Sequence, residues 1–283
     1  MVNNLTQLHV VSTASLPFVA SWFTSKSVGN SLEFFEKIYN QVLDQRQKSG
    51  EKNDDFVDML LDLMKKTKSE DFKRLRITER TIIANAVEFY IAGQDSMSMA
   101  VSMLFFYMTK NPQVEKKLYE EVDAYFERHN GKVTYETFNE LIYLNACLQE
   151  SLRLHPTFTR MDRICTEGTE IKGIKFTKGN IVVLPLWPYN RNPKYFEDPD
   201  TFNPERFMPH NKDKLNPMAV ANFGWGPRMC IGMRFSQEAM IVASLHLLRN
   251  FKFATKPDAK IPYVPGVEVM AYAAYVPLNI QLR

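Results

Sequence analysis

Residues 78–108 restrict the fold of this chain more than any other segment. Their apolar side chains, between Ile82 and Met108, fall on most sides of a helix. Thr78 carries the hydroxyl group that is typical of a helix N-cap, so we expect the helix to begin there. A helix that is apolar on most sides has to be covered by other elements. The segment therefore predicts one long, central, buried helix.

Shorter patterns on both sides predict more helix and a little strand. Amphipathic periodicity predicts helices over four further segments: 31–47, 55–66, 112–130 and 143–156. After Pro156 the period changes to two, and glycines divide residues 169–187 into short strands. A last long helix follows Cys230, and a strand region ends the chain. The chain is therefore predicted to be mainly α with small β-sheets.

Composition argues against several classes of function. The 283 residues include 35 basic and 32 acidic side chains, a net charge of +3, without a Lys/Arg-rich run, so we expect no nucleic-acid partner. Three scattered cysteines do not form a disulfide framework, which suggests a reducing compartment. The histidines match no zinc-site spacing. No apolar stretch suits a membrane span, and the N-terminus does not read as a signal peptide.

The sequence FGWGPRMCIG, residues 223–232, concentrates chemistry around one thiol. Three of the chain's 11 glycines lie here, and glycine permits positive φ angles and close approach to the backbone. The helix expected after Cys230 would direct its unpaired N–H groups and positive dipole end toward the sulfur, and Arg228 adds a cation. These effects favour a thiolate, which suits a metal ligand. The alternative is a buried structural cysteine in a glycine turn.

This loop resembles the haem-ligand loop of the cytochrome P-450 family, whose pattern is Phe-x-x-Gly-x-Arg-x-Cys-x-Gly. Every fixed position is present: Phe223, Gly226, Arg228, Cys230 and Gly232. The resemblance implies the cytochrome P-450 fold, with haem b (iron protoporphyrin IX) bound at these five residues. It implies Cys230 as the axial thiolate on the haem iron, which favours O–O cleavage. It also implies that Arg228 pairs with a haem propionate and that Phe223 packs near the sulfur.

A second motif, LQESLRLHP, places Glu150 and Arg153 on one face of a helix. The ordinary interpretation is an exposed pair worth about 0.2–0.5 kcal/mol. The pair also matches the Glu-x-x-Arg of the same family, and the downstream NPERF supplies the usual third member, Arg206. The resemblance implies a structural role, in which a buried carboxylate between two guanidinium groups fixes the protein around the cysteine loop.

A third motif, FYIAGQDSMSM, lies inside the long helix. Ala92 and Gly93 are small enough for a flat ligand to lie against the backbone, whereas Asp95 and Ser96 are polar in an apolar stretch. A local N-cap, where the helix breaks and restarts, is the alternative. The motif resembles the oxygen-activating segment of the family, which implies that Asp95 and Ser96 deliver protons to bound dioxygen. Ser96 replaces the usual threonine, and its freer rotamer favours peroxide leakage.

Further residues are assigned by their position relative to these motifs. Arg163 falls where the family has a second propionate-binding arginine, and a solvated surface arginine is the alternative. Three residues fall in a stretch that usually faces the substrate: Thr157, Phe158 and Thr159. Glu88 lies two helical turns before Asp95, and we expect it to face the pocket and favour basic or hydroxylated substrates. A boundary carboxylate that contacts water or an arginine is the alternative for Glu88.

The resemblance extends from about Ser31 to the C-terminus and is nearest to the microsomal, animal branch of the family. It implies a monooxygenase that inserts one atom of dioxygen into a lipophilic organic substrate. Electrons would come from NADPH through a flavoprotein reductase that binds on the cysteine side. The implied location is the cytosolic face of the endoplasmic reticulum membrane.

Other family features are missing from the sequence. There is no Trp-x-x-x-Arg match upstream, no N-terminal anchor and no match to the early strands of the main sheet. We therefore expect residues 1–283 to form a single, N-terminally truncated domain that binds haem weakly when expressed alone. The alternative is a truncated, non-catalytic paralogue. The segment LPFVASWF, residues 16–23, is expected to touch a membrane surface, with an ordinary core segment as the alternative.

Overall fold

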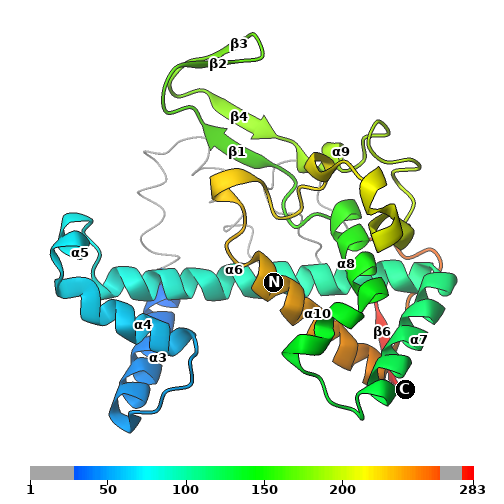
Figure 1. The fold of residues 1–283 in the computed structure, drawn as a ribbon, viewed down its shortest axis with the longest axis horizontal. Coiled ribbons are helices and arrows are strands. Elements are labelled where there is room, and N and C mark those ends of the chain that lie inside the picture. The colour runs from blue at the N-terminus through cyan, green and yellow to red at the C-terminus, as the bar shows by residue number, and fades with distance from the viewer. Residues whose placement is uncertain (1–28, 262–275) are drawn as a thin grey trace. The chain divides into compact units, whose positions relative to one another are not determined.

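The computed structural model describes residues 29–261 and 276–283, which separate into two compact units (Figure 1). One unit contains the described residues up to Asp95, and the other runs from Ser96 to Arg283. The boundary lies inside helix α6 (Glu79–Lys110), so this helix contributes residues to both units. The chain is mainly helical with small antiparallel sheets, which confirms the predicted fold class.

The first unit consists of short helices and the beginning of α6. These helices are α3 (Gly29–Ser49), α4 (Phe56–Lys65), the 3₁₀ turn η1 (Lys66–Lys68) and α5 (Glu70–Arg74). Asp55 is the N-cap of α4, and its carboxylate accepts a hydrogen bond of 3.0 Å from the Asp58 backbone N–H. The unit has a small apolar core made of Leu43, Leu60, Ile82, Ile83, Ala86 and Val87.

Helix α6 begins as predicted, but it is not buried along its whole length. The Thr78 hydroxyl accepts a hydrogen bond of 3.2 Å from the Thr81 backbone N–H, so Thr78 caps the helix. The helix has buried residues near both of its ends: Ile82, Ile83, Ala86 and Val87, and residues 103–106. Its middle is exposed at Glu88–Ile91, so the prediction of a fully buried helix is wrong there. The physical reason is that each of the two apolar cores uses only one end of the helix.

In the second unit, three helices pack with the end of α6 around the main core. These helices are α7 (Pro112–Arg128), α8 (Ile142–Leu154) and α10 (Met233–Asn250), with η2 (Tyr135–Glu140) between α7 and α8. Gly131 follows α7 with φ of 76° and donates its N–H to the Phe126 carbonyl at 2.9 Å, so this glycine caps the end of the helix. The core side chains include Leu104, Phe105, Met108, Leu118, Val122, Leu144, Leu148, Leu245 and Leu248.

Three two-stranded antiparallel ribbons complete this unit. Strand β1 (Met161–Ile164) pairs with β4 (Ile181–Leu184), and Arg163 lies opposite Val182. The hairpin of β2 (Thr169–Ile171) and β3 (Ile174–Phe176) continues the β1–β4 ribbon outward (Figure 1). Strand β5 (Phe251–Ala254) pairs with β6 (Asn279–Leu282). The period-two pattern predicted β2, β3 and β4, whereas β1 was not predicted.

Short turns connect β4 to α10 across a proline-rich segment. They are α9 (Leu186–Tyr189) and the 3₁₀ turns η3 (Pro204–Phe207), η4 (Pro209–Lys214), η5 (Pro217–Ala219) and η6 (Gly226–Arg228). Among the described helices, none combines the length and the apolar character that crossing a bilayer requires. Residues 16–23, which were expected to touch a membrane surface, lie outside the described residues.

Candidate functional site

The cysteine loop is a tight turn that leads into α10. The Cys230 backbone N–H donates to the Phe223 carbonyl at 2.8 Å, which closes the loop on itself. Inside this closure lies η6, with a hydrogen bond of 3.0 Å from the Met229 N–H to the Gly226 carbonyl. Gly224 and Gly226 both have φ of 75°, a left-handed conformation that favours glycine. The glycines noted in the sequence therefore make this turn possible.

Gly224 also lets strand β1 approach the loop closely. A Cβ atom at Gly224 would lie 3.2 Å from the sulfur of Met161 and 3.6 Å from the Cα of Met229. The contact of 3.2 Å is tight, so the Met161 side chain would have to move by a few tenths of an ångström, whereas 3.6 Å is an ordinary contact. The first residue of β1 therefore packs directly against the backbone of the cysteine loop.

The three cysteines differ strongly in their surroundings. Cys147 is fully buried on α8, and this burial raises the pKa of its thiol well above the ordinary value. Cys165 is half-buried, and its S–H donates to the Glu167 carbonyl at 2.9 Å. Cys230 is exposed, and α10 begins three residues later with Gly232 as its N-cap. Only Cys230 therefore combines an accessible sulfur with a nearby helix N-terminus, which excludes the alternative of a buried structural cysteine.

Large apolar side chains beside Cys230 are open to solvent. Ile231 is 86% exposed and Phe235 is 71% exposed, and Trp225 and Met229 are also exposed. Apolar groups of this size are normally covered in a folded protein, so several of them around one thiol indicate a surface that receives an apolar ligand. This surface fits an apolar group that the sulfur could bind.

Two arginines on the same side of the unit are suited to an anionic group. Arg228 is exposed in η6, and Arg163 is half-buried on β1. Met161 and Arg163 lie two residues apart on a strand, so their side chains point to the face that meets the cysteine loop. Within residues 29–261 and 276–283, neither guanidinium forms an ion pair with a carboxylate. The residues present therefore fit a haem group, which the Cys230 sulfur and the two guanidinium groups would hold.

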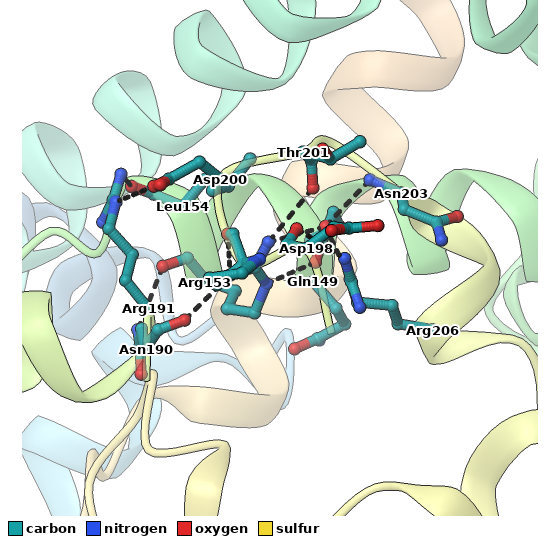
Figure 2. A network of polar contacts seen from close by, with 12 residues as sticks. Gln149, Arg153, Leu154, Asn190, Arg191, Asp198, Asp200, Thr201, Asn203 and Arg206 are labelled. Carbon is teal, nitrogen blue, oxygen red and sulfur yellow. Dashed lines mark hydrogen bonds and ion pairs between the residues drawn. The ribbon is translucent and has the colours of Figure 1, made fainter. Parts of the chain in front are cut away.

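The Glu150 carboxylate is the acceptor in a buried polar network whose donors Arg153, Asn203 and Arg206 are labelled in Figure 2. Arg153 donates to both of its oxygens, through Nε at 2.7 Å and Nη2 at 2.8 Å. The Asn203 backbone N–H donates at 2.8 Å and Arg206 Nε at 3.3 Å. Both Glu150 and Arg153 are completely buried. The structure thus places the Glu-x-x-Arg pair and Arg206 in direct contact, and the pair is not the exposed ion pair of the ordinary interpretation.

The remaining donors of Arg153 bind backbone carbonyls of the segment after α9. Its Nη1 donates to Asn190 O at 2.8 Å and to Pro199 O at 2.7 Å, and its Nη2 reaches Thr201 O at 3.3 Å. Arg206 Nη2 similarly donates to Asp198 O at 2.9 Å. The network therefore ties α8 to the irregular segment that precedes the cysteine loop.

Sequence reasoning missed two members of this region, Asn190 and Asn222. The Asn190 amide donates to Arg153 O at 3.1 Å and to Asn222 Oδ1 at 3.2 Å, and Asn222 directly precedes Phe223. A signal was present for Asn190, because residues 190–193 loosely resemble a His-Arg-Asp-Pro stretch of the family. No sequence signal distinguished Asn222 from other polar residues.

The proposed oxygen segment lies within the continuous helix α6. Ala92 and Asp95 are exposed, whereas Gly93 and Ser96 are half-buried. All four residues are helical, so the alternative of a helix break with a local N-cap does not describe this segment. Their assignment to proton delivery and ligand contact continues to depend on the motif.

The residues assigned to the substrate are distributed between the two units. Glu88 is exposed on α6 in the first unit. In the second unit, Phe158 is exposed, while Thr157 and Thr159 are half-buried in the segment between α8 and β1. The Thr159 carbonyl accepts a hydrogen bond of 3.0 Å from the Trp187 N–H, which joins this segment to α9.

Comparison with known proteins finds one family throughout. The family model described as "Cytochrome P450" matches residues 3–272. Cytochrome P450 3A18 of Rattus norvegicus is 36% identical over 233 residues, which cover 82% of this chain and 46% of that protein. Cytochrome P450 3A56 of Fundulus heteroclitus is 34% identical over 247 residues, covering 87% and 49%. Cytochrome P450 3A13 of Mus musculus is 34% identical over 257 residues, covering 89% and 50%. The chain spans about half the length of the curated relatives it matches.

Proposed function

The chain belongs to the cytochrome P450 family, and on this premise we propose that Cys230 is the thiolate ligand of a haem iron. The observation that carries the proposal is the exposed Cys230 sulfur, held on a closed loop among exposed apolar side chains. When bound, the haem supplies the activation of dioxygen, so that one oxygen atom enters an organic substrate and the other leaves as water. The protein to which this chain belongs is then a haem-thiolate monooxygenase.

The cysteine loop would prepare the thiolate for the metal. Its closing hydrogen bond holds the Cys230 backbone in one position, so the sulfur has little freedom to turn away. The N-terminus of α10 lies three residues away, so its unpaired N–H groups begin close to the loop. Arg228 and Arg163 would hold the two propionates of haem b by charge-assisted hydrogen bonds. Phe223 is partly buried against the main core, so the core supports the first residue of the loop.

The family motif assigns the helix α6 segment to oxygen activation. Asp95 and Ser96 would move a proton toward the bound dioxygen, and Ala92 and Gly93 would leave room for the flat cofactor. The serine hydroxyl can donate and accept as a threonine would, but its rotamer is less restricted. We infer that part of the reducing power is lost as peroxide.

The remaining assignments concern substrate, partner and location. A lipophilic substrate would contact Thr157, Phe158 and Thr159, and Glu88 would favour substrates with a basic or hydroxyl group. Electrons would arrive from NADPH through a flavoprotein reductase, for which the exposed cation Arg234 supplies positive charge near the cysteine loop. The location would be the cytosolic face of the endoplasmic reticulum membrane, as the resemblance to the microsomal branch implies.

The test of the haem ligand compares three cysteine variants after reconstitution with haem. The reduced carbonyl complex of a thiolate-ligated haem has a characteristic long-wavelength Soret band. We expect Cys230→Ser to abolish this band, and Cys147→Ser and Cys165→Ser to retain it. A band that survives in Cys230→Ser, or a wild-type chain that takes up no haem, would contradict the proposal and favour a non-catalytic paralogue.

A further inference from the structure

Asn190 connects the buried Glu150–Arg153 network to the rest of the unit (Figure 2). It is only 1% exposed. Its backbone carbonyl accepts from Arg153 Nη1 at 2.8 Å, and its side-chain Nδ2 donates back to the Arg153 carbonyl at 3.1 Å. These two reciprocal bonds hold Asn190 in a single position relative to α8.

The orientation of the Asn190 amide is determined by its neighbours. Its Nδ2 also donates to Asn222 Oδ1 at 3.2 Å, so this nitrogen faces two acceptors. A reversed amide would place Oδ1 against those same two oxygens, which is unfavourable. In the orientation observed, Asn190 Oδ1 is buried and has no hydrogen-bond partner among the described residues. Folding therefore leaves one buried oxygen unsatisfied in order to keep both N–H bonds, which native proteins usually avoid.

Asn222 transmits this fixed position to the cysteine loop. It receives the Asn190 bond on Oδ1, and its own Nδ2 lies 3.4 Å from the Gln149 carbonyl of α8. The next residue is Phe223, whose carbonyl accepts the Cys230 N–H at 2.8 Å. The Asn222 side chain thus connects the buried network to the residue whose carbonyl closes the loop.

We propose that the Asn190–Asn222 amide pair anchors the cysteine loop, and that Asn222 is the positioning residue for Cys230. The pair acts through the backbone and does not contact the cofactor site itself. Neither amide ionises, so the anchor keeps the same donors and acceptors over the whole pH range in which the chain is folded. The anchor would hold the cysteine loop both with and without a cofactor. Its importance for catalysis rests on the proposed haem function.

Hydrogen exchange of the Cys230 amide measures the anchor without any cofactor. The full chain is compared with Asn222→Ala, with Asn190→Ala and with the double variant. We expect Asn222→Ala to raise the exchange rate of the Cys230 amide by about tenfold, because the loop can then open locally. The effects of the two changes on the exchange rate should be less than additive in the double variant, because both remove the Asn190–Asn222 bond.

Two controls separate anchoring from a general loss of stability. The Gly131 amide, which bonds to Phe126 O in a turn outside the loop, should keep its exchange rate in Asn222→Ala. Asn145→Ala removes an exposed amide on α8 and should leave the Cys230 amide unchanged. Asn222→Asp keeps an oxygen that can accept from Asn190, so it should restore most of the protection. Equal acceleration at Gly131 and Cys230, or no acceleration at Cys230, would overturn the anchor.

The haem-loaded chain gives an independent readout. Asn222→Ala should convert part of the long-wavelength carbonyl band to the shorter-wavelength form that has lost its thiolate, and Asn145→Ala should not. A wild-type chain without haem would refute the proposed function, while the exchange data would still decide on the anchor. A wild-type band with an unchanged Cys230 exchange rate in Asn222→Ala would refute the anchor alone.

Discussion

The accessibility and the protonation of a single cysteine in this chain depend on the residues around it. The sulfur of Cys147 is surrounded by core side chains, so its thiol stays protonated and inaccessible. Cys165 is partly covered, and Cys230 is open to solvent. The rate at which a cysteine reacts depends both on its exposure and on the fraction present as thiolate.

We expect iodoacetamide to label the folded, haem-free chain at Cys230 first, then at Cys165, and last at Cys147. Mass spectrometry of the labelled peptides at increasing times gives the three rates. The same measurement in denaturant is the control, and there the three rates should converge. Labelling of Cys147 as fast as Cys230 in the folded chain would show that α8 is not packed as described.

The buried Glu150–Arg153 pair has a larger effect on stability than its sequence spacing suggests. Arg153→Met would leave the Glu150 carboxylate buried without its main partner, and loss of one partner of a buried pair costs about 3–5 kcal/mol. Urea unfolding should show this loss. Arg160→Met is the matched control, because Arg160 pairs with Asp162 at the surface at 3.4 Å and such pairs contribute about 0–1 kcal/mol. Similar losses in both variants would disprove the buried role of Arg153.

At the scale of elements, a contact between two helices can supply a cap that the sequence of one of them lacks. The Glu121 carboxylate on α7 accepts hydrogen bonds from the first backbone N–H groups of α8, at 2.7 Å from Tyr143 and 2.8 Å from Leu144. A residue of another helix therefore supplies the cap that α8 lacks in its own sequence. Burial raises the pKa of Glu121 above its ordinary value, and the two backbone N–H groups only partly oppose this increase.

This raised pKa predicts how stability depends on pH. Because folded Glu121 holds its proton at higher pH than the unfolded chain does, its contribution to stability is fully present below the ordinary glutamate pKa. The contribution is lost as the pH rises through the raised pKa. The free energy of unfolding of the wild type, relative to Glu121→Gln, should therefore fall over this interval. Denaturant unfolding at a series of pH values measures this difference, and a difference that stays constant or grows with pH would contradict the prediction.

At the scale of the whole molecule, the proposed haem site would join segments that are far apart in the sequence. Arg163 on β1 and Arg228 in the cysteine loop belong to one unit, and neither has a carboxylate partner among the residues described. Under the proposed function, replacing either arginine by leucine would remove a charged hydrogen bond to a propionate, worth about 1.5–3 kcal/mol. We expect each variant to bind haem at least about tenfold more weakly in a spectroscopic titration.

Arg249→Leu provides the comparison for these two variants. Arg249 lies near the other end of α10 and already pairs with Asp123 at 3.3 Å, so its loss should leave haem affinity unchanged. If all three variants weaken binding equally, net charge and not propionate recognition would explain the effect. If only Arg228→Leu does so, the assignment of Arg163 would be wrong.

Local features of the sequence were sufficient for most elements and for the cysteine motif. Thr78 starts α6, Gly131 follows α7, and period-two segments form β2, β3 and β4. Caps, turns and strand alternation depend on neighbours within a few residues, so the sequence alone can determine them. The motifs were likewise enough to identify the family. The residue spacing around Cys230 is highly specific, and the other motifs stand in the expected order.

Only the tertiary structure decided which of these side chains are buried and which meet. The same Glu-x-x-Arg spacing allows an exposed pair or a buried one, and the segment after α9 is what closes over Arg153. The middle of α6 is as apolar as its ends, yet it is exposed because each core covers one end. The Asn190–Asn222 bond joins residues 32 positions apart, which no local pattern encodes. Burial and long-range hydrogen bonds depend on which segments pack together, so they follow from the folded chain and not from any single stretch of its sequence.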